Sequence, residues 1–274
     1  MAAVTPVNIF EWIDDAILES IRWLWDHGEE VDTGHWQGVP TKGKPDLVTR
    51  EIINLQWTAQ MPQTEEEAQE LIMPNLPWAE DHFKERVAGD PSNPGEEYKN
   101  WPWWNDQDAK TMIDGRFTHT YQERFWPTKI DPPPDGVRYS YGDLRSVIGL
   151  LSENPLTRQG TFPIFFPEDT GARHGGRVPC TLHYHFMLRQ GRLHLWYPIR
   201  SCDAVRHFRD DIYMAVRLAQ YVLNQLYDPR SVWAEVELGF LNFQAYSFHV
   251  HKGDIHRYED TEAPRLHGDS GQDR

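Results

Sequence analysis

The sequence predicts one mixed α/β domain. Its 274 residues suit one large domain or two small ones, at about 100–200 residues per domain. Segments with helical periodicity and segments with strand-like alternation follow one another along the chain, and neither an internal repeat nor a clear linker separates them. We therefore expect a single domain over residues 1–258 and a polar tail over residues 259–274.

The composition argues against several classes of protein. The 42 acidic residues exceed the 27 basic residues, giving a net charge of −15, whereas proteins that bind nucleic acids or anionic membranes are basic. With 39% hydrophobic and 13% aromatic residues, the chain is typical of globular rather than disordered proteins. Two cysteines are too few for a disulfide framework, and neither a secretory signal nor a bilayer-spanning apolar run is found. We expect a soluble cytoplasmic protein.

In the N-terminal half, the expected elements are a helix over residues 8–25, a loop over 34–45, a strand over 47–60 and a short helix over 64–73. The first helix is indicated by apolar residues at three- and four-residue spacing that end at Gly28. The short helix is indicated by a capping box of Thr64 and Glu67. The Pro- and Trp-rich sequence over 89–135 predicts an irregular lobe whose Trp side chains pack rather than bind a ligand.

In the C-terminal half, the expected elements are a helix over 143–151, strands over 181–189 and 193–199, a helix over 211–226 and a strand over 232–251. The two neighbouring strands each place apolar residues on one face by strict alternation. Gln190-Gly191 lies between them and is typical of a tight turn. These two strands therefore form a predicted β-hairpin.

The predicted hairpin brings reactive residue types together. Its turn lies midway between Cys180 and Arg200, so we expect Arg200 to return beside Cys180. A nearby guanidinium favours the thiolate, which is the nucleophilic form of cysteine. Ser201 and Asp203 follow directly at the same end of the strand. An isolated cysteine is more often a small buried apolar residue, and we leave Cys202 with that interpretation.

These residues resemble motifs of the thymidylate synthase and pyrimidine hydroxymethylase family. The segments Val178-Pro179-Cys180 and Arg200-Ser201-Cys202-Asp203 match its Pro-Cys nucleophile and its Arg-Ser-x-Asp motif, at the family's interval. Residues 154–159, with Arg158, resemble its Asp-Pro-x-Ser-Arg-Arg loop, and Phe248-His249-Val250-His251 resembles its Leu-His-Val-Tyr strand. The similarity is good over residues 141–226 and weaker to residue 251. Upstream, Tyr121 compares with a Tyr-Gly segment of the family and Glu85 with its catalytic Glu.

The resemblance implies a large twisted mixed sheet with flanking helices, one face of which forms a homodimer interface. It also implies one-carbon transfer from 5,10-methylenetetrahydrofolate to a pyrimidine nucleoside monophosphate at active sites shared between the subunits. The Cys180 thiolate would add to C6 of the ring and so make C5 nucleophilic. The implied roles of the other residues are catalysis by Glu85 and Asp211, folate binding by Asp203, and substrate binding by Tyr121, Arg158 of the partner subunit, Arg200, Ser201, Asp211, His249 and His251.

The chain departs from the family pattern in three places. Gln159 replaces a second Arg, so a phosphate-binding charge would have to come from Lys42, Lys44 or Arg173. His251 replaces the Tyr of the sugar-binding pair. The C-terminus lacks the apolar end that closes over the folate in thymidylate synthases.

Two histidine pairs raise the alternative of a metal site. His183 and His185, like His249 and His251, are two residues apart, so each pair shares one face of a strand. Such pairs can ligate zinc, which needs a third ligand with convergent geometry. No such ligand is evident in the sequence, and we expect packing or polar-cleft roles and no metal.

The identity of the base is indicated by Asp211, eight residues after Asp203. The family carries Asn there when the base is uracil. An ionised carboxylate only accepts hydrogen bonds, so it suits the N4 amino group of cytosine better than the O4 of uracil. Residues 208–211 also resemble the Phe-Arg-Asn-Asp of phage dCMP hydroxymethylases. The alternative role of Asp211 is that of a carboxylate at a helix N-terminus, which we assign to Asp210.

The leading hypothesis is therefore a dCMP 5-hydroxymethylase, in which water attacks the exocyclic methylene after the folate leaves, in a bacterial or phage-infected cytoplasm. The alternatives are a thymidylate synthase acting on dUMP, a dUMP or CMP hydroxymethylase, and a non-catalytic nucleotide-binding homologue.

Overall fold

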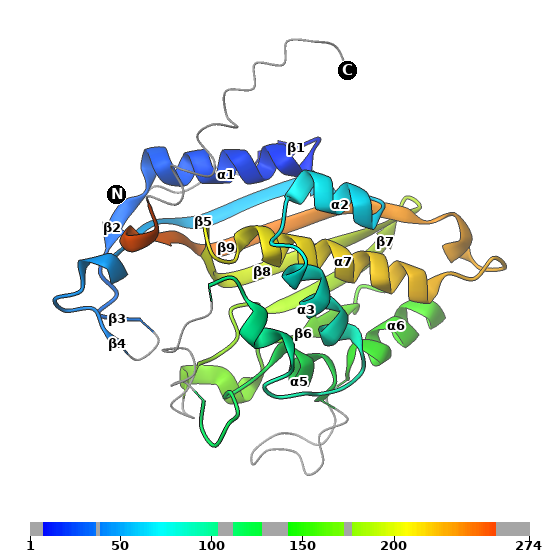
Figure 1. The fold of residues 1–274 in the computed structure, drawn as a ribbon. Coiled ribbons are helices and arrows are strands. Elements are labelled where there is room, and N and C mark those ends of the chain that lie inside the picture. Colours follow the sequence, from blue (N-terminus) through cyan, green and yellow to red (C-terminus); the bar gives the residue numbers. More distant parts are fainter. Residues whose placement is uncertain (1–7, 37–38, 104–111, 128–141, 173–176, 256–274) are drawn as a thin grey trace.

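The computed structural model describes residues 8–36, 39–103, 112–127, 142–172 and 177–255 (Figure 1). Its strands are β1 (Asn8–Phe10), β2 (Glu29–Val31), β3 (His35–Trp36), β4 (Val39–Pro40), β5 (Thr49–Gln60), β6 (Thr161–Pro163), β7 (His183–Arg189), β8 (Arg192–Asp203) and β9 (Glu237–His251). Its α-helices are α1 (Ile13–His27), α2 (Glu65–Ile72), α3 (Trp78–Val87), α5 (Tyr121–Phe125), α6 (Leu144–Glu153) and α7 (Phe208–Leu226).

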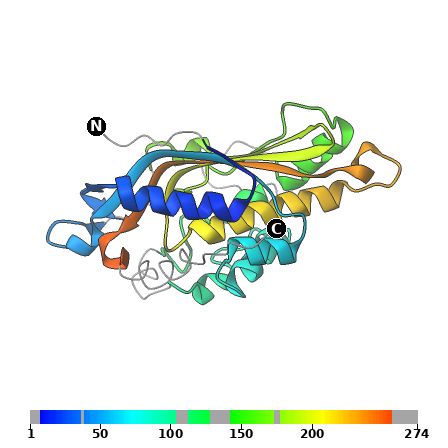
Figure 2. The same cartoon turned by 90° about the horizontal axis from the view of Figure 1, so that it is seen from above.

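The long strands form one mixed sheet in the order β1-β5-β9-β8-β7-β6, with β2 also paired to β5. The pairs β1–β5 and β8–β9 are parallel, and the other pairs of this sheet are antiparallel. Helices α1 and α7 lie along the same face of the long strands (Figure 2). The predicted α/β class, with a large mixed sheet and flanking helices, is confirmed.

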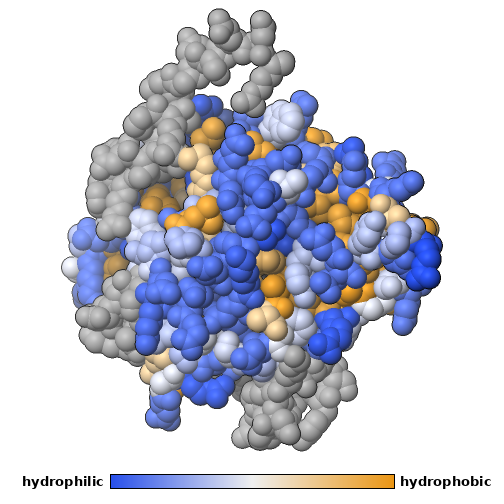
Figure 3. All heavy atoms as spheres, turned by 45° about the vertical axis from the view of Figure 1, so that its right-hand side comes forward, coloured by the Kyte–Doolittle hydropathy of each residue, from blue (hydrophilic) through white to orange (hydrophobic). Residues whose placement is uncertain are grey.

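The core lies between this sheet face and α7. Ile212, Ala215 and Ala219 of the helix are fully buried, as are Leu195 and Phe243 of the sheet. The apolar spacing of three and four residues along α7 places these side chains on the stripe that faces the sheet. On the outer surface, hydrophilic side chains cover most of the face drawn in Figure 3.

A buried ion pair joins α3 to α7. Arg217 donates from Nε and Nη2 to the two carboxylate oxygens of Glu80, each at 2.9 Å, and the Tyr213 hydroxyl donates to the same carboxylate at 2.8 Å. Arg217 Nη2 also reaches Glu65 Oε2 of α2 at 2.6 Å. This network holds α2 and α3 against the helix that carries Asp211.

Alternating side chains of β5 and β9 point away from α7. Ile53, Phe240 and Tyr246 are exposed, whereas their neighbours Ile52 and Ala245 are buried. Successive side chains of a strand face opposite sides of a sheet, so these three apolar residues lie on the opposite sheet face.

A β-bulge interrupts the parallel pairing of β8 with β9. Leu193 pairs with Leu238, but Leu195 pairs with Leu241, so β9 has one extra residue at this point. From Leu195 onward the register is constant and brings Asp203 opposite His249. An ideal Cβ on Gly239 would lie 2.5 Å from His194 Nδ1, so only glycine fits there without a shift.

The hairpin and the capping box are confirmed. Gln190 and Gly191 have φ angles of 53° and 71°, the left-handed values that a two-residue type I′ turn needs. The Thr64 hydroxyl accepts from the Glu67 backbone N–H at 3.2 Å, and the Glu67 carboxylate accepts in turn from the backbone of Thr64.

Several element boundaries differ from the expected ones. The first helix begins at Ile13, because the backbone of Trp12 is extended, and Asn8–Phe10 forms a strand instead. The final strand begins at Glu237, after a 3₁₀ turn over Val232–Glu235. Short strands β3 and β4 lie inside the expected loop over 34–45.

Helices α3 and α5 were not expected. The prolines before α3 favour a loop when the sequence is considered alone, yet Pro77 occupies the N-cap position, directly before the first helical residue Trp78. The lobe over 89–135 is described only in part, and the tail over 259–274 lies outside the described residues. No helix in the described segments has the length and apolar character needed to cross a membrane.

Candidate active site

Arg200 lies beside Cys180, as the hairpin predicts. Its Nη2 is 3.8 Å from the Cys180 sulfur, and the Arg200 backbone N–H donates to the Cys180 carbonyl at 2.9 Å. The same guanidinium donates from Nε to the carbonyl of Pro179 and from Nη2 to that of Val178, both at 2.9 Å. Arg200 therefore fixes the segment that carries the thiol.

The pKa of the Cys180 thiol is nevertheless raised. Burial has the largest effect, because it disfavours the charged thiolate. Arg200 and Arg177 lower this pKa, whereas the carboxylates of Asp211 and Asp203 raise it. The expected influence of Arg200 is present, but burial outweighs it in the free protein.

Two cavities meet at Cys180, with volumes of about 210 and 370 Å³. We call them the α3 cavity and the β9 cavity, after the elements that line each of them. The residues that line both are Trp101, Arg177, Val178, Cys180, Ser201 and His207. Cys180 therefore lies at the junction of the two cavities.

In the α3 cavity, Asp211 lies in the first turn of α7. Burial raises the pKa of its carboxyl group to about 7, with smaller upward effects from Asp210 and Asp203, while the Arg86 guanidinium lowers it. The raised pKa favours the protonated carboxyl group, which can donate as well as accept a hydrogen bond.

Tyr121 also lines the α3 cavity. Its hydroxyl lies 3.1 Å from Thr181 Oγ1, and its ring is stacked under the Arg86 guanidinium, 4.0 Å from the ring centroid. Thr181 directly follows Cys180, so Tyr121 contacts the segment that carries the thiol.

Glu85 turns to a different set of partners. Gln122 donates to its carboxylate at 2.6 Å, His82 lies 3.5 Å away, and the backbone N–H of Glu96 donates to it as well. His82 and Arg86, four residues apart on α3, line the cavity. The catalytic role of Glu85 stays a prediction.

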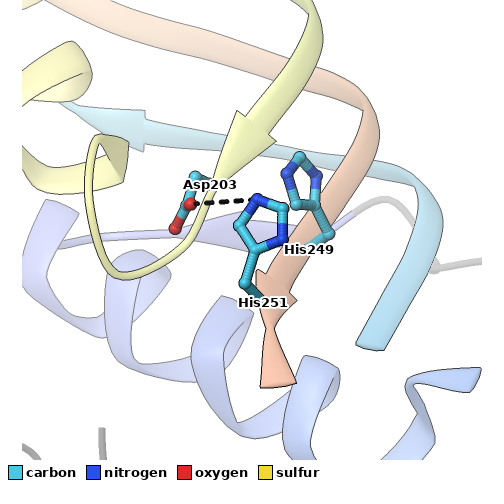
Figure 4. Close-up of side chains that lie close together, drawn as sticks. All are labelled: Asp203, His249 and His251. Atoms are coloured by element: carbon cyan, nitrogen blue, oxygen red, sulfur yellow. Dashed lines mark ion pairs between the residues drawn. The ribbon is translucent and has the colours of Figure 1, made fainter. Parts of the chain in front are cut away.

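The β9 cavity holds Arg200, Asp203, His249 and His251. Asp203 Oδ1 accepts from the backbone N–H groups of Val205 and Arg206, each at 3.0 Å. Although burial opposes it, the neighbouring His249 and His207 help to hold the pKa of Asp203 below its usual value. Figure 4 shows Asp203 and the two histidines side by side.

The other predicted phosphate-binding residues are spread out. Ser201 lines both cavities, whereas Arg158 is exposed in the loop after α6. Lys42 and Lys44 are exposed, and Arg173 lies outside the described residues.

Sequence reasoning missed Arg177, His82, Arg86 and His207. Arg177 lines both cavities, as does His207, which stacks on Trp101 with ring centroids 4.7 Å apart. Trp101 therefore packs as expected but also faces the cleft. The i, i+4 spacing of His82 and Arg86 is a usable signal only once α3 is recognised as a helix.

Comparison with known proteins agrees with this architecture. The chain matches no family model, but it is similar to curated proteins named "Putative thymidylate synthase". It is 24% identical over 249 residues to the one from Methanosarcina acetivorans, covering 88% of each chain. It is 28% identical over 134 residues to the one from Methanosarcina barkeri, covering 45% of this chain and 55% of that protein.

The fold is also that of a solved structure. Thermostable thymidylate synthase A from Bacillus subtilis superposes with a TM-score of 0.61 at 15% identity, over 90% of this chain and 82% of that chain. The chain therefore has the thymidylate synthase fold.

Proposed function

We propose that this chain is a transferase that moves a one-carbon unit from 5,10-methylenetetrahydrofolate to C5 of a pyrimidine nucleoside monophosphate. The observation that carries the proposal is the Arg200–Cys180 contact where the α3 and β9 cavities meet. The fold and the names of the similar proteins support the same reaction class.

In the proposed reaction, the Cys180 thiolate forms a bond to C6 of the pyrimidine, and C5 gains the electron density needed to attack the one-carbon unit. The proton on C5 and the bond to sulfur are lost in later steps, which restores the aromatic ring. Ser201, Arg177 and Arg200 line the cavity on the side where the nucleotide phosphate would lie. A guanidinium matches a phosphate well, because it donates two parallel hydrogen bonds.

We propose cytosine as the base. With one proton shared between Asp211 and the ring nitrogen N3, the carboxylate accepts from both N3–H and the N4 amino group, a charge-assisted pair. Uracil has a carbonyl oxygen at position 4, and this oxygen is a far weaker base than a ring nitrogen. When uracil is bound, the proton must therefore stay on the Asp211 carboxyl group. Burial raises the pKa of Asp211 to about 7, which keeps that proton available for cytosine but also lets a protonated carboxyl group donate to the O4 of uracil. The support for cytosine is therefore the resemblance of residues 208–211 to the Phe-Arg-Asn-Asp of phage dCMP hydroxymethylases.

The product in this proposal is the 5-hydroxymethyl nucleotide, formed when water attacks the exocyclic methylene. The alternative is a thymidylate synthase, which the names of the similar proteins favour. We also propose a homodimer with shared sites: Arg158 is exposed where it can reach a partner, and the apolar residues Ile53, Phe240 and Tyr246 lie on the sheet face away from α7.

One assay separates these possibilities. The protein is incubated with methylenetetrahydrofolate and dCMP, dUMP or CMP, and the nucleotide is analysed by mass spectrometry. The proposal expects dCMP to gain the mass of CH₂O. A gain of CH₂ on dUMP identifies a thymidylate synthase instead. Nucleotide binding without any change in mass identifies a non-catalytic homologue.

A further inference from the structure

Asp203, His249 and His251 form a compact group in the β9 cavity (Figure 4). One potential ligand atom from each residue lies within 4.8 Å of those from the other two. Asp203 comes from the end of β8 and the histidines from the end of β9. The third ligand that the histidine pair lacks in the sequence is thus supplied by the neighbouring strand.

The separation of these atoms is wrong for hydrogen bonding between them. His251 Nε2 and Asp203 Oδ2 are 3.9 Å apart, well beyond a hydrogen bond. Two atoms that share one zinc ion at 2.0–2.2 Å each are at most about 4.4 Å apart. The observed distance therefore fits two ligands of a common ion better than a direct contact.

Each of the three side chains is held by a second partner that leaves one ligand atom directed at the others. His249 Nδ1 lies 3.1 Å from Ser247 Oγ, and His251 Nδ1 lies 3.4 Å from the Leu47 carbonyl, so Nε2 of each ring is left for an ion. Asp203 is anchored through Oδ1 by two backbone N–H groups, which leaves Oδ2. Metal-binding histidines are oriented in this way, with the second ring nitrogen bonded to the protein.

The local charges permit a cation. Asp203 and His251 are only 7% and 5% exposed, so the group is shielded from solvent. Arg206 lies 4.0 Å from Asp203 Oδ2 but is paired with Asp254 at 2.7 Å. Glu51, whose carboxyl group is bonded to Ser247, adds a further acidic group behind His249.

From this geometry we infer a binding site for a divalent transition-metal ion of the zinc class, ligated by Asp203, His249 and His251. Two imidazoles and one carboxylate suit Zn²⁺, Co²⁺ or Fe²⁺ rather than Mg²⁺ or Ca²⁺. Three protein ligands leave coordination positions directed into the cavity that also holds Ser201 and Cys180. The inference departs from our expectation of no metal, and it stands independently of the proposed reaction.

If both proposals hold, the ion lies where the resemblance places the sugar-binding pair. The nucleotide hydroxyl groups would then meet the cation rather than the imidazoles themselves.

The test uses the full, untagged chain, stripped with a chelator and titrated with Zn²⁺ in a calorimeter without nucleotide or folate. We expect saturable binding of one ion per chain. Asp203→Asn and His251→Gln should each weaken it at least about tenfold, and Ser247→Ala, which removes the partner of both His249 and Glu51, by about 10- to 100-fold. Titration with Co²⁺ should give visible absorption bands that the ligand variants lose.

The control variant, His183→Gln with His185→Gln, removes the other histidine pair, which lies on β7, and should bind Zn²⁺ like the parent. Cys180→Ser should also bind Zn²⁺ like the parent. This variant tests whether the thiolate, which lines the same cavity, serves as a ligand. The inference is overturned if the parent binds no ion, if the control loses as much affinity as His251→Gln, or if binding depends on Cys180 and not on His251. Circular dichroism checks that each variant is folded.

Discussion

The Arg200 guanidinium lies against the Cys180 sulfur, 3.8 Å from Nη2, while its remaining bonds hold the carbonyls of Val178 and Pro179. A single side chain thus both positions the thiol and offsets part of the cost of charging it. Burial still has the largest effect on the pKa of Cys180 and raises it. The thiol is therefore the predominant form in the free protein near neutral pH.

Replacing Cys180 with Ser should abolish the release of tritium from C5-labelled nucleotide, because a hydroxyl is a much poorer nucleophile than a thiolate. The matched control is Cys202→Ser, since Cys202 is 1% exposed and belongs to the core. Release that persists in Cys180→Ser, or is lost only in the control, would rule out Cys180 as the nucleophile.

Replacing Arg200 with Met should raise the pKa of Cys180 further, since a nearby cation is removed. The rate of alkylation by iodoacetamide at neutral pH should fall, and its pH profile should move to higher pH. Arg192→Met, at the exposed start of the same strand, provides the control. An unchanged profile in Arg200→Met would mean that the guanidinium does not act on the sulfur.

Replacing Asp211 with Asn should shift the base preference toward dUMP, because the amide supplies a permanent donor for O4. Opposing two acceptors costs roughly 1–3 kcal/mol, or about ten- to a hundredfold in specificity. In the parent, turnover of dCMP should fall as the pH rises through about 7, where Asp211 loses its proton, and this dependence should vanish in Asp211→Asn. A parent that prefers dUMP contradicts the cytosine assignment.

The same substitution should affect stability in a pH-dependent way. The carboxyl group of Asp211 titrates near 3.8 when unfolded and near 7 when folded, so the parent loses stability as the pH rises between these values. The melting temperature of Asp211→Asn minus that of the parent should therefore be more positive at pH 8 than at pH 4, by at least about 2 °C. A pH-independent difference would show that the carboxyl group is ionised in the folded protein.

Mixing two inactive variants tests the shared site. Hybrid dimers of Arg158→Ala and Cys180→Ser should regain part of the activity, because one of their two sites contains both intact residues. Each variant alone is the control. Sedimentation that finds an active monomer at the assay concentration would contradict the shared site.

Replacing Arg217 with Met should destabilise the fold by about 3–5 kcal/mol, because it leaves the buried Glu80 carboxylate with only the Tyr213 hydroxyl and the exposed Lys84 as partners. The double variant Glu80→Leu with Arg217→Met should recover most of this loss in urea unfolding, since no buried charge remains. Equal instability of the single and double variants would show that the network acts through shape rather than charge.

The sequence predicts the hairpin next to Cys180 better than it predicts helix α3, which lines the cavity at Cys180. The hairpin that joins Cys180 to Arg200 depends on alternation and turn chemistry, both of which are local. Helix α3 depends on its packing against α7 through the Glu80–Arg217 pair, which joins residues 137 positions apart. Local pattern therefore does not reveal it, and with it His82 and Arg86 are missed.

The sequence predicts the direction in which Arg200 acts on the pKa of Cys180, but not the net shift, which is in the opposite direction. The contact of Arg200 with Cys180 follows from the hairpin, but the opposing effect of burial depends on walls contributed by segments distant in the sequence, such as that of Trp101. The same holds for Asp211, whose helical position is visible in the sequence and whose raised pKa is not.

The extra residue in β9 near Gly239 lies between two stretches of regular pairing with β8. Deleting it would remove the bulge and leave Leu238 opposite Leu193 and Leu241 opposite Leu195, so His249 would stay opposite Asp203. Because a bulge bends the strand and increases its local twist, the deletion would change the direction of β9 at a point ten residues, or roughly 33 Å, from His249. For an engineer, this strand end is therefore a place from which to adjust the position of both imidazoles relative to the carboxylate without altering any of the three residues.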